Sequence, residues 1–288
     1  MLGTGLTVKL ATFTLTLAAL DSAVPQEQAA HRTRYLRLPV AERAQPAEKA
    51  PEPAAELHVL WNGRIYAGER LLYDPELEDR AALREWLKKT AGKMERKPVG
   101  EESPELELPD GLLLIRADDA APFKYVQGLM VECGASWVGI WRIHLATRSA
   151  PKGSGETVEG RLDVSLPVID CAEAENYREP LELKMLVLAP GDRITMPFGE
   201  PWREKEDEPY FFDPATRKLQ FQIGPRKMDD HRALAERVEG LVGSAKRDDQ
   251  KLPMMIDPRV GTVVGDVTGL MDVLIEAGIG SISFASSD

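Results

Sequence analysis

Alternating and clustered apolar residues predict two successive folded units. In the first unit, two strand-like runs flank Asn62-Gly63, a pair typical of β-hairpin turns because both residues tolerate positive φ. Apolar side chains on one face, with acidic residues just before them, predict a helix at about 80–93. A buried strand at 112–117, a helix starting at Pro122 and an alternating strand at 140–146 complete the unit. This order predicts a small mixed sheet, since strand–helix–strand connections usually join parallel neighbours.

The second half of the chain repeats this order of elements. A strand at 183–188, a turn containing Gly191 and a helix at 231–246 correspond to the start of the first unit. Further matches fall in a strand, on a helix face, at the Gly that ends the helix and in the last strand. The aligned segments are Leu113–Met130 with Met254–Met271 and, after a two-residue slip, 139–146 with 278–285. We interpret the halves as a duplicated domain, the alternative being a chance similarity of two strand–helix–strand units.

These patterns divide the chain into five segments. They are a signal-like or weak membrane-anchor segment at 1–23, a linker rich in Pro, Ala and Glu at 24–56, a first module at 57–147, a linker with a possible extra strand at 148–181, and a second module at 182–288 with an insertion at 198–223. The predicted fold class is α+β, with two tandem ββαβαβ-type modules, each a small mixed sheet with two helices packed on it. The first linker is expected to be extended, because its composition cannot offset the entropy of ordering it.

The amino-terminal segment bears on the compartment. Leu10–Leu20 is apolar but shorter than the roughly 20 residues that span a bilayer. Its length is typical of the apolar region of a signal peptide. We therefore expect export or anchoring, and a plain β-forming segment is the alternative.

Charge and cysteine content exclude some classes of function. The net charge is −11, from 36 Lys+Arg and 47 Asp+Glu, so nucleic acid is not expected as a partner. The two cysteines, Cys133 and Cys171, are too few and too far apart for a zinc ribbon or a CxxC motif. They are expected to be buried free thiols, with a single disulfide as the alternative.

A search for catalytic motifs finds none. The chain has no P-loop, no GxSxG and no HExxH, and its four histidines are scattered at His31, His58, His144 and His231. Asp118-Asp119 is interpreted as a solvated strand–helix loop, and Arg116 beside Asp118 as a surface pair. The sequence therefore predicts no catalytic residue, no cofactor-binding residue and no metal ligand, and a protein that is not an enzyme.

The repeated segments resemble the extracytoplasmic domain of the ExbD/TolR biopolymer-transport family. The resemblance lies in VTGLMDVLIEAGI (Val267–Ile279) with the final strand SISFA, in IRADDAAPFKYVQGLM and GIWRIHLA of the first half, and in the hairpin around Asn62-Gly63. It covers about half of the chain. It implies a periplasmic, often dimeric domain that hangs from one transmembrane helix beside a proton-driven motor protein. The chain departs from the family in its tandem arrangement, and because Asp21 does not lie inside a convincing span.

The expected function is that of a non-enzymatic envelope protein that binds or couples partner proteins in macromolecule transport, on the periplasmic side of the inner membrane. The expected partners are a motor-type membrane protein or a periplasmic energy-transfer protein, with homo-oligomers formed through exposed sheet edges. A cell-wall or small-ligand binding module is one alternative, supported only by aromatic residues at 202–212. An enzyme with an unrecognised site is the other.

Overall fold

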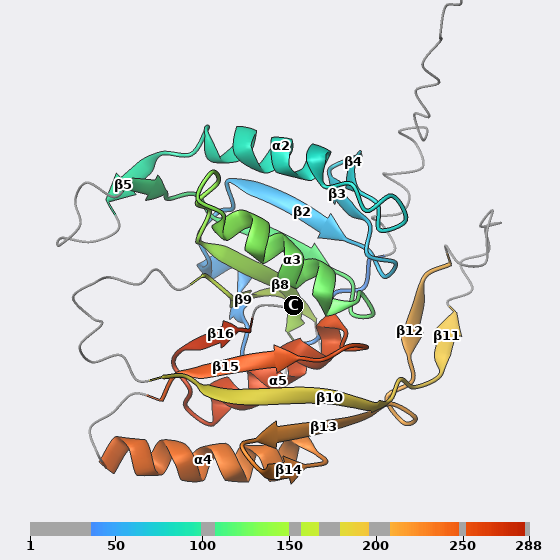
Figure 1. Cartoon of the computed structure of the whole chain (residues 1–288), viewed down its shortest axis with the longest axis vertical. Helices are drawn as coiled ribbons and strands as arrows, with labels where there is room; N and C mark the ends of the chain where they lie inside the picture. Colours follow the sequence, from blue (N-terminus) through green and yellow to red (C-terminus); the bar gives the residue numbers. More distant parts are fainter. Residues whose placement is uncertain are drawn as a thin grey trace, which may run out of the picture.

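The computed structural model describes residues 36–98, 107–149, 157–166, 179–195, 208–247 and 252–285. Within these ranges the chain is a mixed α+β structure with two main sheets, so the predicted fold class is confirmed. Figure 1 shows the two sheets as two parts of the molecule, with the first module above the second. The segment 1–23 and residues 24–35 of the predicted linker lie outside the described residues.

The first module follows the predicted order of strands and helices. Its elements are β2 (Ala55–Val59), β3 (Ile65–Ala67), β4 (Arg70–Tyr73), α2 (Ala81–Ala91), β7 (Leu113–Ala117), α3 (Phe123–Gly134) and β8 (Ile143–Ser149), with a small hairpin of β5 (Arg96–Pro98) and β6 (Glu107–Pro109) before β7. β9 (Val158–Asp163) and β1 (Gln45–Pro46) extend the sheet, whose order is β1-β9-β8-β7-β2-β3-β4. β2, β7 and β8 are parallel neighbours, as the strand–helix–strand pattern predicts.

The second module has the same core. Its elements are β10 (Leu181–Ala189), β13 (Lys218–Ile223), β14 (Arg226–Met228), α4 (His231–Arg247), β15 (Met254–Pro258), α5 (Val264–Glu276) and β16 (Ile282–Phe284), with a hairpin of β11 (Arg193–Thr195) and β12 (Tyr210–Phe212) inserted after β10. The sheet order β14-β13-β10-β15-β16 matches β4-β3-β2-β7-β8.

The register of the two sheets repeats as well. In the first sheet Leu113 lies opposite Ile143, and in the second Met254 lies opposite Ile282. These are the residues that the sequence alignment pairs. A chance similarity of sequence would not fix the same partner residues across two sheets, so the register supports duplication.

The modules meet at equivalent residues. Pro122 and Val263, which immediately precede α3 and α5, form an isolated antiparallel bridge. The Phe123 N–H donates to Thr262 O and the Val264 N–H donates to Ala121 O, both at 2.9 Å. This pair of hydrogen bonds relates the two modules approximately by a two-fold rotation.

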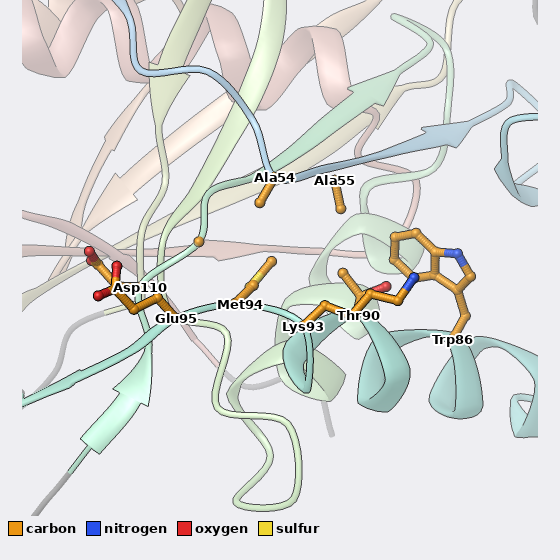
Figure 2. Close-up of a pocket in the computed structure, with 9 residues that line it drawn as sticks. Ala54, Ala55, Trp86, Thr90, Lys93, Met94, Glu95 and Asp110 are labelled. Atoms are coloured by element: carbon orange, nitrogen blue, oxygen red, sulfur yellow. The ribbon is translucent and has the colours of Figure 1, made fainter.

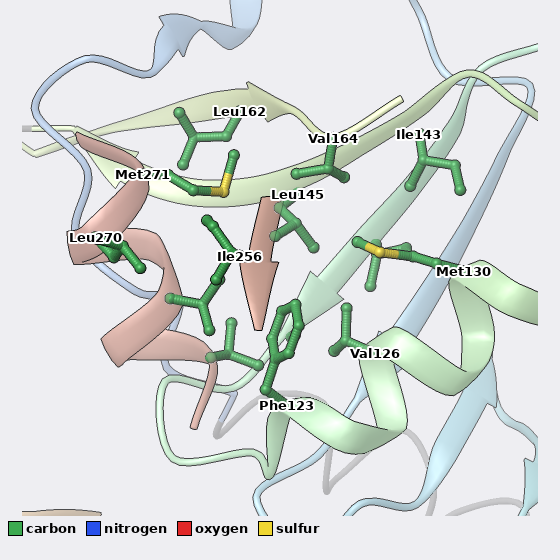
Figure 3. Packing of buried hydrophobic residues seen from close by; sticks show 14 of the residues in the cluster. Phe123, Val126, Met130, Ile143, Leu145, Leu162, Val164, Ile256, Leu270 and Met271 are labelled. Carbon is green, nitrogen blue, oxygen red and sulfur yellow. The ribbon is translucent and has the colours of Figure 1, made fainter. Parts of the chain in front are cut away.

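The apolar core is continuous between the modules. Phe123, Val126 and Met130 from α3 face Leu145 of the first sheet and Ile256 of the second (Figure 3). All five side chains are at most 3% exposed. Burial of this shared core holds the two halves together as one body, because separation would expose it to water.

Two predicted boundaries are corrected by the structure. The described part of the 24–56 linker packs onto the first module, because Leu38, Ala41 and Ala44 bury their side chains there. The insertion was predicted at 198–223, but 218–223 is β13, a strand of the second sheet. Its Phe221 and Ile223 alternate into the core, and the charged residues around it concealed this period of two.

Candidate functional site

The last strand of the second sheet has an open edge. The Met254 N–H donates to Ser281 O at 3.0 Å, and the Ala285 N–H donates to Ile256 O at 2.8 Å. Because the direction of hydrogen bonding alternates along a strand, Ile282 and Phe284 direct their backbone groups away from β15. Within the described residues, no strand pairs with β16 on that side.

An apolar groove of about 310 Å³ runs along this open edge. Three segments that are far apart in the sequence form it. They are α3 with Gln127, Met130, Val131 and Gly134, the segment Val164–Leu166 that follows β9, and residues 282–285 of β16 and its end. Lined by aliphatic and aromatic side chains and by strand backbone, the groove offers apolar contacts and hydrogen bonds together.

Two contacts fix β16 against α3. The Gln127 amide donates to Ala285 O, and the Phe123 and Phe284 rings lie 5.1 Å apart between centroids. Gln127 is only 4% exposed although it is polar. Its hydrogen bond satisfies the buried amide and holds the end of the edge strand in place.

The equivalent edge in the first module is covered by the chain itself. Ile143, the counterpart of Ile282, accepts a hydrogen bond at 2.9 Å from the Val164 N–H. β9 pairs along the rest of β8 in antiparallel orientation. In the second module no described segment takes the place of β9. The two modules are therefore alike in core and different at this edge.

A second cavity, of about 520 Å³, lies at one end of the first module. Trp86 and Met94, from α2 and the turn after it, line it opposite Ala54 and Ala55 (Figure 2). Two carboxylates line it, and both lie near Lys97. Asp110 pairs with Lys97 Nζ at 2.7 Å and with Arg142 at 3.0 Å, and Glu95 lies 3.8 Å from Lys97 Nζ.

The hydrogen bond from Lys97 is the main cause that lowers the pKa of Asp110. A carboxylate held in this way is a poor candidate for a catalytic base, because its oxygens already accept hydrogen bonds from Lys97 and Arg142. The groove at β16 is therefore the better candidate site.

The structure corrects the interpretation of Asp118-Asp119. Asp118 is 1% exposed rather than solvated, and its carboxylate accepts the Arg37 N–H at 2.8 Å and the Ala120 N–H at 2.9 Å. Burial raises the pKa of Asp118 to about 7. Arg116 does not pair with Asp118, and instead contacts Glu56 at 2.9 Å and Glu159 at 2.5 Å.

The cysteines and the aromatic insertion considered in the sequence analysis do not form a catalytic or metal-binding site in the part of the chain that the structure describes. Cys133 is buried and its pKa is raised by that burial, whereas Cys171 lies outside the described residues. In the part of the chain that the structure describes, no three His, Cys, Asp or Glu side chains gather in a way that could hold a metal ion. Tyr210 and Phe212 of the aromatic insertion pack on Trp61 and Tyr66, so this part of the insertion closes a core.

Sequence reasoning did not find the groove at β16, because its lining residues come from three segments that are far apart in the sequence. No helix among the described residues is long and apolar enough to cross a membrane. In comparisons with known proteins, no family model matches the sequence and no curated protein matches it.

Proposed function

We propose that this chain is a non-enzymatic envelope protein of the ExbD/TolR type, which binds an extended segment of a partner protein along the open edge of β16. The observation that carries the proposal is this open edge, which lies beside an apolar groove. In the first module the equivalent edge, that of β8, is covered by β9. Strand addition of this kind supplies affinity through main-chain hydrogen bonds and specificity through side-chain pockets.

β9 indicates what such a segment looks like. Gly160, Leu162 and Val164 are buried, whereas Arg161 and Asp163 between them are more exposed. A partner segment that alternates in the same way would place its apolar side chains against Met130 and Phe284. The proposed partner segment is therefore extended, about five residues long, and apolar at every second position.

The proposed setting follows the family resemblance. The partner belongs to the envelope, as a motor-type membrane protein or a periplasmic energy-transfer protein, and binding couples it to macromolecule transport. Fractionation of cells that express a carboxyl-terminally tagged chain tests the setting. Release from membranes by detergent but not by carbonate is expected for an anchored form, and a shortened soluble product for an exported form. A full-length cytoplasmic product would contradict the envelope setting.

Photo-crosslinking in cells tests partner binding. A benzoylphenylalanine at Val131, which lines the groove and is 55% exposed, is compared with one at Val260, which is 99% exposed and outside the groove. We expect a crosslink to an envelope protein from Val131 only. Ile282→Pro should abolish the crosslink because it removes an outward N–H, whereas Ile282→Val should keep it.

Two results would contradict the proposal. One is equal crosslinking from both positions, and the other is a crosslink at Val131 that survives Ile282→Pro. A crosslink to a second copy of the chain would mean that the edge of β16 binds another copy of this protein instead of a different partner. That result would support the homo-oligomer expected from the sequence.

The cavity beside Trp86 supports a second candidate function, the binding of a small or cell-wall ligand. The partly buried ring of Trp86, beside the small residues Ala54 and Ala55, can stack on an apolar ligand face. Retention of the chain on purified wall material, lost in Trp86→Ala and kept in Ile282→Pro, would favour this function over partner binding.

A further inference from the structure

Helices α3 and α5 lie in equivalent places beside the two sheet edges. The alignment of Leu113–Met130 with Met254–Met271 pairs Met130 of α3 with Met271 of α5. Met271 is buried in the core that also holds Leu162 of β9, the strand that covers the edge of β8 (Figure 3). Met130 lines the groove beside the open edge of β16. α3 therefore presents to a bound segment the helix face that α5 presents to the chain's own cover.

The cover of the first module is held to α5 by charged and polar groups. Residues 36–46 lead into β1, which pairs with β9. Asp272 accepts the Glu42 N–H at 2.5 Å and the Arg43 N–H at 3.1 Å. The Arg43 guanidinium also pairs with Glu276, one turn further along α5. Two carboxylates of one helix face thus recognise this segment of the chain.

The equivalent positions of α3 carry no charge. Continued beyond Met130, the alignment pairs Asp272 with Val131 and Glu276 with Ala135. Val131 lines the groove and is 55% exposed. Neither aliphatic side chain can accept an N–H group or pair with a guanidinium. The helix face beside β16 therefore cannot hold residues 36–46 of a second copy in the way that α5 holds them in their own chain.

The rest of the groove has the same character. None of the described residues that line it is charged, although 29% of the chain is charged and its net charge is −11. Its polar members already have partners, since the Gln127 amide donates to Ala285 O and the Ser165 hydroxyl accepts the Ile143 N–H at 3.2 Å. A charged side chain placed here would lose its water and gain no ion pair.

We propose that Val131 of α3 determines which segment the edge of β16 accepts. The occupant is an extended segment of a different protein that presents uncharged, apolar side chains to the groove and to Val131. Segments that carry charge at these positions, such as residues 36–46, are rejected. The inference rests on the proposed strand binding at β16 and adds the chemistry that selects the strand.

Two effects give Val131 this role. Covering its exposed methyl groups with an apolar side chain removes apolar surface from water, which favours binding. A charged side chain in the same place would be desolvated without a partner, which disfavours the wrong segment. Since more than half of Val131 is exposed, its replacement alters the groove and leaves the core of the module intact.

Co-purification with the tagged full chain tests the proposal, and the probe is the envelope protein that the Val131 crosslink captures. Val131→Asp should lower the amount of this protein recovered by at least about tenfold, because its carboxylate has no partner in the groove. Val131→Leu should retain the wild-type amount. Val260→Asp adds the same charge at a position outside the groove that is 99% exposed, and it should also retain the wild-type amount. Circular dichroism and urea unfolding should be the same for all four chains.

The variant Ile282→Pro separates this inference from partner binding itself. If Ile282→Pro abolishes recovery and Val131→Asp does not, strand binding at β16 stands and selection by Val131 is wrong. If recovery survives Ile282→Pro, or if no envelope protein is recovered with the wild type, strand binding is wrong and the inference falls with it. Recovery of a second copy of the chain through its residues 36–46 would also overturn the inference.

Discussion

Replacement of Arg217 by Met should cost about 3–5 kcal/mol in the free energy of unfolding. Arg217 and Asp266 form an ion pair in which each side chain is 7% exposed. The guanidinium Nε donates to Asp266 Oδ1 at 2.8 Å, and its terminal nitrogens donate to the Pro190 and Gly261 carbonyls. Without Arg217 the Asp266 carboxylate is left buried and unpaired beside the start of α5.

The magnitude comes from the uncompensated charge and not from the pair itself. A double variant, Arg217→Met/Asp266→Asn, removes the charge and keeps an oxygen for the Val263 N–H, which donates to Asp266 at 2.9 Å. It should therefore recover about half of the loss. An exposed pair provides the control, since Arg232 and Glu236 are 89% and 66% exposed and Arg232→Met should cost less than about 1 kcal/mol.

Urea unfolding followed by tryptophan fluorescence and by circular dichroism measures these values. Coincident transitions are required before a single free energy is assigned. A loss for Arg217→Met no larger than that for Arg232→Met would refute the reasoning. It would mean that the Asp266 carboxylate is hydrated or protonated once its partner is removed.

Three further predictions concern the core and its titrating groups. Gly63→Ala should destabilise by more than Gly68→Ala in the same unfolding assay, because both have positive φ but only at Gly63 would the new methyl group meet the Tyr125 ring. The raised pKa of Asp118 contributes stability that is fully present below its unfolded value of 3.8 and is lost as pH rises to about 7. The free energy of unfolding of the wild type, measured relative to that of Asp118→Asn, should therefore fall between about pH 4 and pH 7. The Cys133 thiol, whose pKa is raised by burial, should resist alkylation at pH 8 until urea unfolds the chain, as measured by mass spectrometry of its peptide.

Local patterns predicted the core of each module. The Asn62-Gly63 turn, the apolar face of α2 and the start of α3 after Pro122 each depend on residues close together in the sequence. The alignment of Leu113–Met130 with Met254–Met271 extended these predictions to the second module, and the shared register of the two sheets supports the alignment. Packing of this kind is encoded by periodicity, so it is visible without a structure.

Long-range contacts were not predictable in the same way. Residues 36–46 fall in a segment whose overall composition predicts a linker, yet their backbone hydrogen-bonds to Arg148 and Asp118. Asp118 reads as solvated because its neighbours in sequence are polar, while the residues that bury it lie elsewhere. The groove at β16 is formed by α3, residues 164–166 and residues 282–285. A local sequence pattern cannot predict that segments so far apart in the chain lie together.

The most direct test of the account supplies a strand to the open edge of β16. A variant with a second copy of residues 150–166 after Asp288 holds the equivalent of β9 near β16 at high effective concentration. Amide exchange by NMR should show new protection at Ile282 and Phe284, no change at Ile143, and loss of the partner crosslink from Val131. If Ile282 and Phe284 exchange as in the original chain, β16 does not accept a strand, and the proposed mode of partner binding is wrong.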